Sequence, residues 1–271
     1  MDRRVGGIET DGMLVKYPRT PHLQGSRVQP GDEDLATLPF SAIRGRNLVV
    51  EEKLDGANAG ISVGPDGRLR LQSRGHYLMG GPRERQFGPL KAWAAALGPR
   101  LAPRLGERFI LFGEWLYATH TVFYDALPHW FCAFDVLDRS DGSFLDTPGR
   151  LELLDGLPVV SVPVLHRGPV ERLDDLVALI GPSTCRTPAW RDALLEAARR
   201  AGADPDRAVS DLDTNDAMEG LYIKVEENGR TVGRSKWVRP TFLTAIRDSG
   251  THWADRPLLE NGLRDPAVLH A

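Results

Sequence analysis

The chain has 271 residues, a formal net charge of −3 at pH 7 and 41% hydrophobic residues. This length allows one large domain or two small ones, either of them with a substantial core. The near-neutral charge excludes a basic surface over the whole molecule, so a nucleic-acid partner requires a local basic patch. No apolar run is long enough to span a bilayer, and the first residues form no signal segment. We therefore expect a cytoplasmic protein without a membrane partner.

The chain contains two cysteines, Cys132 and Cys185. They are far apart in the sequence and lack the paired spacing of a zinc site. We expect both to be buried thiols in a reducing compartment.

Residues 1–46 are rich in proline, glycine and charge, and we expect them to form an N-terminal arm that is part of the same domain. Within the arm, residues 16–23 (KYPRTPHL) are expected to be extended, because a residue that precedes proline avoids the helical conformation. The two cations and the histidine of this stretch would either contact phosphate or form a charged surface.

From Asn47 onward the pattern is typical of β-strands, with a Gly-Pro-Asp-Gly turn at residues 64–67 that joins two of them. The strands predicted in this part of the chain are residues 48–53, 57–63, 68–74, 108–117 and 130–137. A glycine-rich basic loop precedes a predicted helix at residues 87–101. The helix is predicted from apolar residues that share one face, which are Leu90, Trp93, Ala94 and Leu97.

The loop between the last two of these strands, residues 118–129, carries His120, Tyr124 and His129. The three side chains would form a metal site or a general base if they met in space. Their spacing fits no common zinc pattern, which favours a structural role.

Residues 140–215 are expected to form a helical insertion that packs on the sheet and carries no chemistry. Asp146-Thr147-Pro148 predicts the start of a helix, with a capping side chain and a proline in the first turn. Further elements expected in the insertion are a strand within residues 159–165 and helices at 171–180 and 188–201.

The chain returns to β-structure at residues 218–225 and 231–238. Asn228-Gly229 between them is a strong hairpin signal, because both turn positions of a tight hairpin favour these residues. A short helix and a polar tail are expected over residues 241–271.

Each predicted strand presents charged groups beside apolar neighbours. Charged side chains on buried strands are unfavourable unless they face a ligand or each other. A cleft lined with both signs of charge suits a nucleotide with its phosphates and a magnesium ion. The charged residues in question are Lys53, Asp55, Arg74, Glu114, Asp135, Glu219, Lys224, Arg234 and Lys236.

Six short segments in this pattern resemble the ordered motifs of the covalent nucleotidyltransferases, and Asn58 after the first motif resembles the ATP-dependent RNA ligase branch. The segments are KLDG (53–56, motif I), SRG (73–75, Ia), FGEW (112–115, III), AFDV (133–136, IIIa), EGLYIK (219–224, IV) and RSKW (234–237, V). The resemblance covers residues 47–240. It implies an α+β fold, a nucleotidyltransferase (ATP-grasp-like ligase) domain of antiparallel sheets flanked by helices.

The resemblance also implies roles for individual residues. Lys53 would attack the α-phosphate of ATP and form a lysyl-AMP bond. Nearby cations (Arg74, Lys224 and Lys236) and a metal would favour its neutral form. Glu114 would bind the ribose, and Phe134 would stack on the adenine. The expected nucleotide-binding residues are Glu52, Lys53, Asn58, Arg74, Glu114, Phe134, Glu219, Lys224, Arg234 and Lys236. The expected ligands of Mg²⁺ (or Mn²⁺) are Asp55, Asp135 and Glu219.

The spacing of the last two motifs sets a condition on the fold. Arg234 and Lys236 are two residues apart, so they share one face of a strand. Glu219 and Lys224 are five apart and would lie on opposite faces. They can serve one site only if Glu219 precedes the regular strand or a bulge intervenes. Arg234 stands where the family more often has lysine, which keeps the charge but changes the geometry.

The implied function is that of an ATP-dependent RNA ligase, which joins 5′-phosphate and 3′-hydroxyl ends through lysyl-AMP and an adenylylated 5′ end. Only about 35 residues follow motif V, too few for an OB domain. RNA contacts are therefore expected from the arm, from the domain surface or from a partner protein that supplies nucleic-acid binding or end processing. The surface candidates are His76, Tyr77, Arg83 and Arg85.

Two other functions remain open at this point. An adenylyltransferase that modifies a small molecule or a protein would use the same lysine. A non-catalytic binder of nucleotides or nucleic-acid ends would not need it, so the presence of Lys53 and Glu219 favours catalysis.

Overall fold

The computed structural model describes residues 14–28, 31–242 and 257–270. Within them a ten-stranded sheet has the strand order β3-β2-β4-β5-β6-β10-β9-β1-β8, and β7 pairs with β5 off this path. The strands are β1 Leu48–Lys53, β2 Ala57–Val63, β3 Leu69–Ser73, β4 Phe109–Trp115, β5 Phe131–Asp138, β6 Ser143–Leu145, β7 Val160–Ser161, β8 Val164–Gly168, β9 Gly220–Glu227 and β10 Arg230–Val238. The pairings between these strands are antiparallel, except that of β5 with β7, which is parallel. The α+β fold with antiparallel pairing is confirmed.

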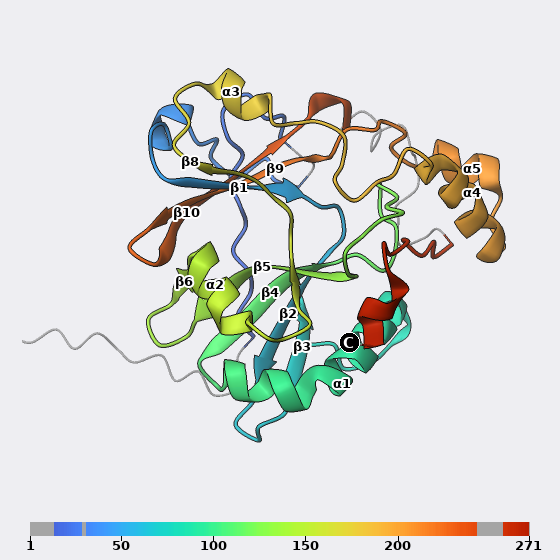
Figure 1. Ribbon diagram of the computed structural model, residues 1–271, viewed down its shortest axis with the longest axis horizontal. Coiled ribbons are helices and arrows are strands. Elements are labelled where there is room, and N and C mark those ends of the chain that lie inside the picture. The colour runs from blue at the N-terminus through green and yellow to red at the C-terminus, as the bar shows by residue number, and fades with distance from the viewer. Residues whose placement is uncertain (1–13, 29–30, 243–256, 271) are drawn as a thin grey trace, which may run out of the picture.

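Figure 1 shows the sheet in two halves, with β1, β8, β9 and β10 above and β2 to β5 below. The α-helices are α1 Gly88–Leu105, α2 Thr147–Leu154, α3 Leu173–Val177, α4 Trp190–Arg200 and α5 Pro205–Ser210. Short 3₁₀ helices are η1 Phe40–Ala42, η2 Pro82–Phe87 and η4 Pro266–His270.

Each half of the sheet has its own apolar core. Helix α1 covers the lower half, where its Leu90 and Leu97 pack in one cluster with Ile61 of β2. The upper half is covered by the arm and α3, which contribute Leu23 and Leu176 to a second cluster. The amphipathic face predicted for α1 is thus the face that packs on the sheet.

Most predicted strands agree with the structure within one or two residues, and the hairpin turn is confirmed. Asn228 and Gly229 have φ values of 52° and 77°, the left-handed conformation that a tight hairpin turn requires. The predicted start of α2 is also confirmed, because the Asp146 side chain accepts a hydrogen bond from the backbone N–H of Gly149 at 2.9 Å.

Residues 140–215 differ from the helical insertion that we expected. They contribute three strands as well as four helices, and two of these strands extend the main sheet. Strand β6 pairs with β5 and β10, and β8 pairs with β1. Strand β6 has three residues, too few for an alternating pattern to be recognised. Helix α5 was not predicted, although Asp204-Pro205 is a regular helix start.

The arm packs along the free edge of β10. His22 pairs with Lys236 in a parallel bridge, and the N–H of Leu23 donates to the carbonyl of Lys236 at 2.8 Å. The helix expected after Pro240 lies mostly outside the described residues.

Both cysteines are buried and free, as predicted. Cys132 on β5 and Cys185 in the connection before α4 belong to one apolar cluster. In the part of the chain that the structure describes, no helix combines the length and the apolarity that a bilayer crossing demands.

Candidate active site

A cavity of about 900 Å³ is lined by residues from β1, β2, β4, β5, β9, β10 and the arm. Seven of the predicted nucleotide-binding or metal-binding residues line it, namely Glu52, Lys53, Asn58, Arg74, Glu114, Phe134 and Lys236. Five others, namely Asp55, Asp135, Glu219, Lys224 and Arg234, are not among the lining residues. The predicted set is therefore divided between the cavity wall and the layer behind it.

Lys53 is the last residue of β1 and faces the cavity with 22% of its side chain exposed. Its Nζ atom lies 2.7 Å from Oε1 of Glu219, which is 1% exposed. Glu219 directly precedes β9, whose first residue, Gly220, pairs with Lys53. The condition set by the sequence is met, since Glu219 lies outside the regular alternation of the strand.

The charge on Lys53 is stabilised in this arrangement. Burial alone would lower the pKa of Lys53, but the carboxylates of Glu219 and Glu114 outweigh it and raise this pKa above its ordinary value. Burial raises the pKa of Glu219 to about 7, against the opposing effect of Lys53. The expected excess of cations around Lys53 is therefore absent from the described surroundings, where acidic neighbours dominate.

Motif I is held against the end of β4 by a close backbone approach. A Cβ atom on Gly56 would lie 2.5 Å from the carbonyl oxygen of Trp115, so a side chain does not fit there. The N–H of Gly56 donates to Oε1 of Glu114 at 3.1 Å. Glycine at this position brings the motif I turn and the Glu114 carboxyl together.

Glu114 and Asn58 face each other in the β2–β4 register. Burial raises the pKa of Glu114 to about 7, while Lys53 and Arg74 act to lower it. The Oδ1 atom of Asn58 is buried and has no hydrogen-bond partner among the described residues. Buried polar atoms without a partner are uncommon in folded proteins, and a nucleotide contact of Asn58 remains a prediction.

Asp55 is engaged by the protein backbone. Its Oδ2 atom accepts hydrogen bonds from the N–H groups of Thr121 and Val122 at 2.7 and 2.8 Å, and its own N–H donates to the Tyr124 hydroxyl at 2.8 Å. These bonds fasten the loop of residues 118–129 to motif I. A metal contact of Asp55 remains a prediction.

The aromatic and imidazole groups of this loop lie in different surroundings. His129 is 1% exposed, and burial lowers its pKa to about 4. His120 lines the cavity, with Nε2 at 3.4 Å from Oε1 of Gln86. Across residues 14–28, 31–242 and 257–270, no three His, Cys, Asp or Glu side chains are grouped so that they could hold a metal ion.

A buried ion network joins β1, β5, β9 and β10 beside the cavity, which its member Glu51 also lines. Lys224 Nζ lies 2.9 Å from Glu51 and 3.2 Å from Asp135, and Arg234 Nε lies 2.9 Å from Asp135. Arg150 of α2 completes the network through Glu51 at 3.0 Å. Despite burial, Lys224 and Arg234 lower the pKa of Asp135. The network supports the cavity wall, because Lys224 also donates to the carbonyl oxygen of Phe134.

The aromatic wall of the cavity is formed by Phe134, Tyr222 and Tyr17 of the arm. The rings of Tyr17 and Phe134 lie 5.1 Å apart in an edge-on arrangement. The Tyr17 hydroxyl contacts Asp135 and lies 2.6 Å from the Tyr222 hydroxyl. Sequence reasoning missed Tyr17, and the only local signal was its place before Pro18.

The Glu52 side chain is held from outside the sheet. Its carboxylate accepts hydrogen bonds from the Ser183 hydroxyl at 2.5 Å, the Thr184 N–H at 3.0 Å and the Thr184 hydroxyl at 2.5 Å. These partners belong to the segment that we expected to carry no chemistry. They fix the residue that precedes Lys53.

The loop predicted to contact RNA lies between β3 and α1. His76 lines the cavity, and its Nε2 lies 3.7 Å from Glu84. Arg85 is exposed, and Tyr77 forms a bridge with Gln72 of β3. An RNA contact of this loop remains a prediction.

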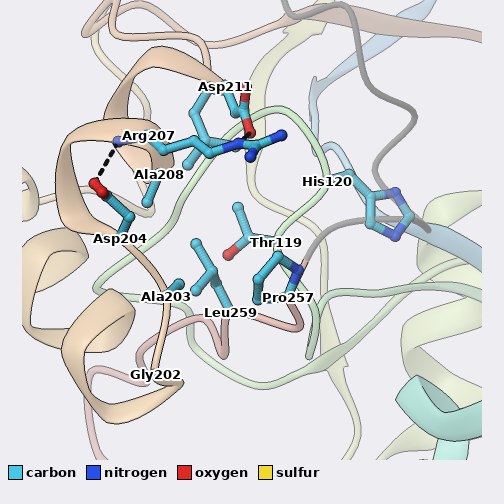
Figure 2. Close-up of a pocket in the computed structure, with 11 residues that line it drawn as sticks. Thr119, His120, Gly202, Ala203, Asp204, Arg207, Ala208, Asp211, Pro257 and Leu259 are labelled. Atoms are coloured by element: carbon cyan, nitrogen blue, oxygen red, sulfur yellow. Dashed lines mark hydrogen bonds and ion pairs between the residues drawn. The ribbon is translucent and has the colours of Figure 1, made fainter.

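A second, smaller cavity of about 300 Å³ lies between the loop of residues 118–129 and the α4–α5 turn (Figure 2). The N–H of Arg207 donates to Asp204 at the start of α5, and Leu259 and Ala203 provide apolar wall. His120 lines both cavities. The smaller cavity contains none of the predicted nucleotide-binding or metal-binding residues.

Comparisons with known proteins agree with this architecture. A search among curated proteins returned no match. The chain is similar to solved structures of an RNA ligase from Naegleria gruberi. One with PPi has a TM-score of 0.55 and 18% identity, and the alignment covers 90% of this chain and 64% of that chain. A mutant with AMP and Mn has a TM-score of 0.54 and 17% identity, with 87% and 59% covered.

A mutant of that ligase with ATP and Mn has a TM-score of 0.51 and 17% identity, with 77% and 54% covered. At these identities the likeness concerns the fold, and the chain spans between 54 and 64% of the length of these three structures. The family model for RNA ligase matches residues 46–238, which is most of the sequence and includes every motif described above. The chain belongs to the RNA ligase family.

Proposed function

We propose that this chain is an ATP-dependent RNA ligase that joins 5′-phosphate and 3′-hydroxyl ends. The observation that carries the proposal is the position of Lys53, at the wall of a cavity of nucleotide size and 2.7 Å from Glu219. The RNA ligase match over residues 46–238 supports it.

In the first step, the neutral Nζ atom of Lys53 attacks the α-phosphorus of ATP. A P–N bond forms, the bond to the pyrophosphate oxygen breaks, and Nζ loses its remaining extra proton. Lys53 must therefore exchange its ion pair with Glu219 for an environment that favours the amine. Phosphate-binding cations at the cavity wall, Arg74 and Lys236, stabilise the charge on the α-phosphate and on the leaving pyrophosphate.

The other cavity residues position the nucleoside. Asn58 Oδ1, which lacks a partner among the described groups, accepts a hydrogen bond from the nucleotide. Glu114 binds the ribose hydroxyls, and the aromatic wall with Phe134 stacks on the adenine. Glu52, fixed by Ser183 and Thr184, lies beside the base.

The donor set fits a divalent metal of the Mg²⁺ or Mn²⁺ type only in part. The expected ligands Asp55, Asp135 and Glu219 carry the carboxylate oxygens that such ions prefer. Asp135 is already paired with Lys224 and Arg234, and Asp55 accepts from backbone N–H groups, so phosphate oxygens and water would have to complete the shell. When bound, the metal withdraws negative charge from the phosphates and disfavours the ammonium form of Lys53.

The AMP group then passes to the 5′-phosphate of RNA, and a 3′-hydroxyl displaces AMP to seal the strand. The basic loop after β3 is the surface that we assign to the RNA, because His76 connects it to the cavity. Exposed cations hold RNA mainly through its phosphates.

The test is to incubate the protein with α-labelled ATP and a divalent metal. We expect a labelled protein whose label is lost in Lys53→Arg, which keeps a cation beside Glu219 and so preserves the fold. Lys91→Arg, which changes a half-exposed lysine of α1, serves as the matched control. A label that persists in Lys53→Arg would overturn the lysyl-AMP step.

The labelled protein is then supplied with 5′-phosphorylated RNA, nicked duplexes or DNA. Transfer of label to RNA followed by sealing is the expected result. Transfer only to a small molecule or to a protein would establish an adenylyltransferase instead. Nucleotide binding without any label would indicate a non-catalytic binder.

A further inference from the structure

One carboxylate links the arm to β10 at the cavity wall. Asp32 Oδ1 lies 3.0 Å from Nη2 of Arg19, and Oδ2 forms an ion pair with Nζ of Lys236. His22 Nε2 lies 3.5 Å from the same Oδ2 atom. Arg19, Asp32 and Lys236 all line the large cavity. An acidic side chain therefore lies between two cations of the wall where we expect phosphates to bind.

The backbone fixes the two cations on one wall. The arm runs beside β10, with the N–H of Lys236 donating to the carbonyl of Pro21 at 3.0 Å. Thr20, next to Arg19, lies within hydrogen-bonding distance of the Tyr222 hydroxyl at 3.0 Å. The bridge between His22 and Lys236 thus holds the arm against β10, and Asp32 bridges Arg19 of the arm and Lys236.

Asp34 also binds Arg19 but does not lie between the two cations. It therefore allows the orientation of Arg19 to be distinguished from occupation of the space between Arg19 and Lys236. Its carboxylate accepts hydrogen bonds from both terminal nitrogens of Arg19, at 2.7 and 2.8 Å, but it is 71% exposed and does not line the cavity. Asp32 contacts both cations and is only 15% exposed. Burial opposes the ionisation of Asp32, yet hydrogen bonds from Lys236 and Arg19 dominate and lower its pKa.

A carboxylate that bridges a guanidinium and an ammonium offers them the same kind of oxygen contacts as a phosphate does. We propose that Arg19 and Lys236 form a subsite for the polyphosphate part of the nucleotide, and that Asp32 occupies this subsite until the polyphosphate displaces it. The inference rests on the proposed function for the identity of the nucleotide. No covalent step is involved, since one anion replaces another.

This exchange has two consequences for the reaction. A ligand with two or more linked phosphates gains both cations when it displaces Asp32, whereas the single phosphate of AMP reaches Lys236 but not Arg19 and gains less. After the first step, the carboxylate competes with the leaving pyrophosphate for Arg19 and Lys236. Asp32 therefore selects for polyphosphates and assists the release of pyrophosphate.

The experiment measures the affinity of the full chain for inorganic pyrophosphate by calorimetry. Asp32→Asn removes the competing charge while keeping the size of the side chain, and Asp34→Asn is the matched control. We expect Asp32→Asn to bind pyrophosphate about tenfold more tightly than the wild type, a change of about 1.4 kcal/mol. We expect less than about a threefold change in pyrophosphate affinity for Asp34→Asn, and in Asp32→Asn a smaller gain in affinity for AMP than for pyrophosphate.

Arg19→Gln tests the other side of the subsite and does not depend on the folding of the Asp32 variant. It should weaken pyrophosphate binding, and in combination with Asp32→Asn it should remove the gain. Unchanged or weaker pyrophosphate binding in a folded Asp32→Asn protein would overturn the proposal. An Arg19→Gln protein that binds pyrophosphate like the wild type would overturn it too.

The two proposals can fail separately. Pyrophosphate binding requires no lysyl-AMP, so a tighter Asp32→Asn protein that never takes up label supports the subsite and refutes the ligase step. If the wild type takes up label but Asp32→Asn binds pyrophosphate with the same affinity as the wild type, the subsite is refuted and the ligase step is not.

Discussion

Glu114 is poised to change its protonation in the neutral range. Burial raises its pKa from 4.5 to about 7, so the folded protein keeps a proton that the unfolded chain releases near pH 4.5. The contribution of this group to the free energy of unfolding is complete below pH 4.5 and is lost as the pH rises to 7. A glutamine at this position would retain the acceptor for the Gly56 N–H without titrating.

We therefore expect Glu114→Gln to lose less stability than the wild type between pH 5 and pH 8, by on the order of 1 to 3 kcal/mol. Urea denaturation at the two pH values measures the difference. A residual slope should remain, since Glu219 has a pKa of about 7 as well. The exposed Glu107→Gln serves as the control, and identical pH profiles for Glu114→Gln and the wild type would contradict the expectation.

At the scale of elements, Glu51 joins β1 to α2 and β9. Its carboxylate pairs with Arg150 and Lys224, and each of the three side chains is 1% exposed. Removing the negative charge leaves Arg150 and Lys224 buried beside Asp135, a carboxylate that Lys224 already shares with Arg234. Breaking a buried pair in this way is strongly destabilising, typically by about 3 to 5 kcal/mol.

We expect Glu51→Gln to lower the free energy of unfolding by that amount in denaturant titrations. The matched control is Glu171→Gln, which breaks an ion pair with Arg44 that is more than 60% exposed on both sides. It should change stability by less than about 1 kcal/mol. Equal effects of the two substitutions would show that the buried network contributes no more than a surface pair.

The elements also show what a sequence can and cannot predict. Alternation and turn chemistry placed β1, β2 and the β9–β10 hairpin, because these signals are local. The motifs that identified Lys53 and Glu114 are also local, since each is a short run of consecutive residues. Whether Lys224 or Arg234 faces a ligand or a buried carboxylate depends on partners more than 80 residues away, and no local pattern carries that information.

The arm illustrates the same limit. Asp32 lies among glycine and charged residues that look like an ordinary loop in the sequence, and its contact with Lys236 spans 204 positions. Only the first residues of strand β8 fell within the predicted strand, because a half-buried strand at the sheet edge has a weak alternating pattern. Long-range pairing decides these features.

At the scale of the whole molecule, the two halves of the sheet both contribute walls to the large cavity. A nucleotide that contacts both halves binds the folded protein but not the unfolded chain, and it therefore stabilises the folded state by mass action. With a non-cleavable ATP analogue and Mg²⁺ at 100 times the dissociation constant, we expect about 2.7 kcal/mol of stabilisation. For a chain of this size that corresponds to a rise in Tm of roughly 5 to 10 °C.

Thermal melts followed by fluorescence measure this shift. Lys236→Ala, which removes one cation from the wall, should reduce the shift at a fixed analogue concentration. An analogue that leaves Tm unchanged at every concentration would contradict the assignment of the cavity to a nucleotide.

The two buried thiols can be used to detect local unfolding of this protein. Cys132 is 0% exposed in a central strand, and Cys185 is 1% exposed in a connecting segment. Burial raises the pKa of both thiols, that of Cys185 to about 12, so little thiolate exists in the closed state. An alkylating reagent therefore modifies them only during excursions that expose them. The order in which the two sulfur atoms become alkylated identifies which part of the chain detaches first, and a cysteine introduced on the surface would react before either.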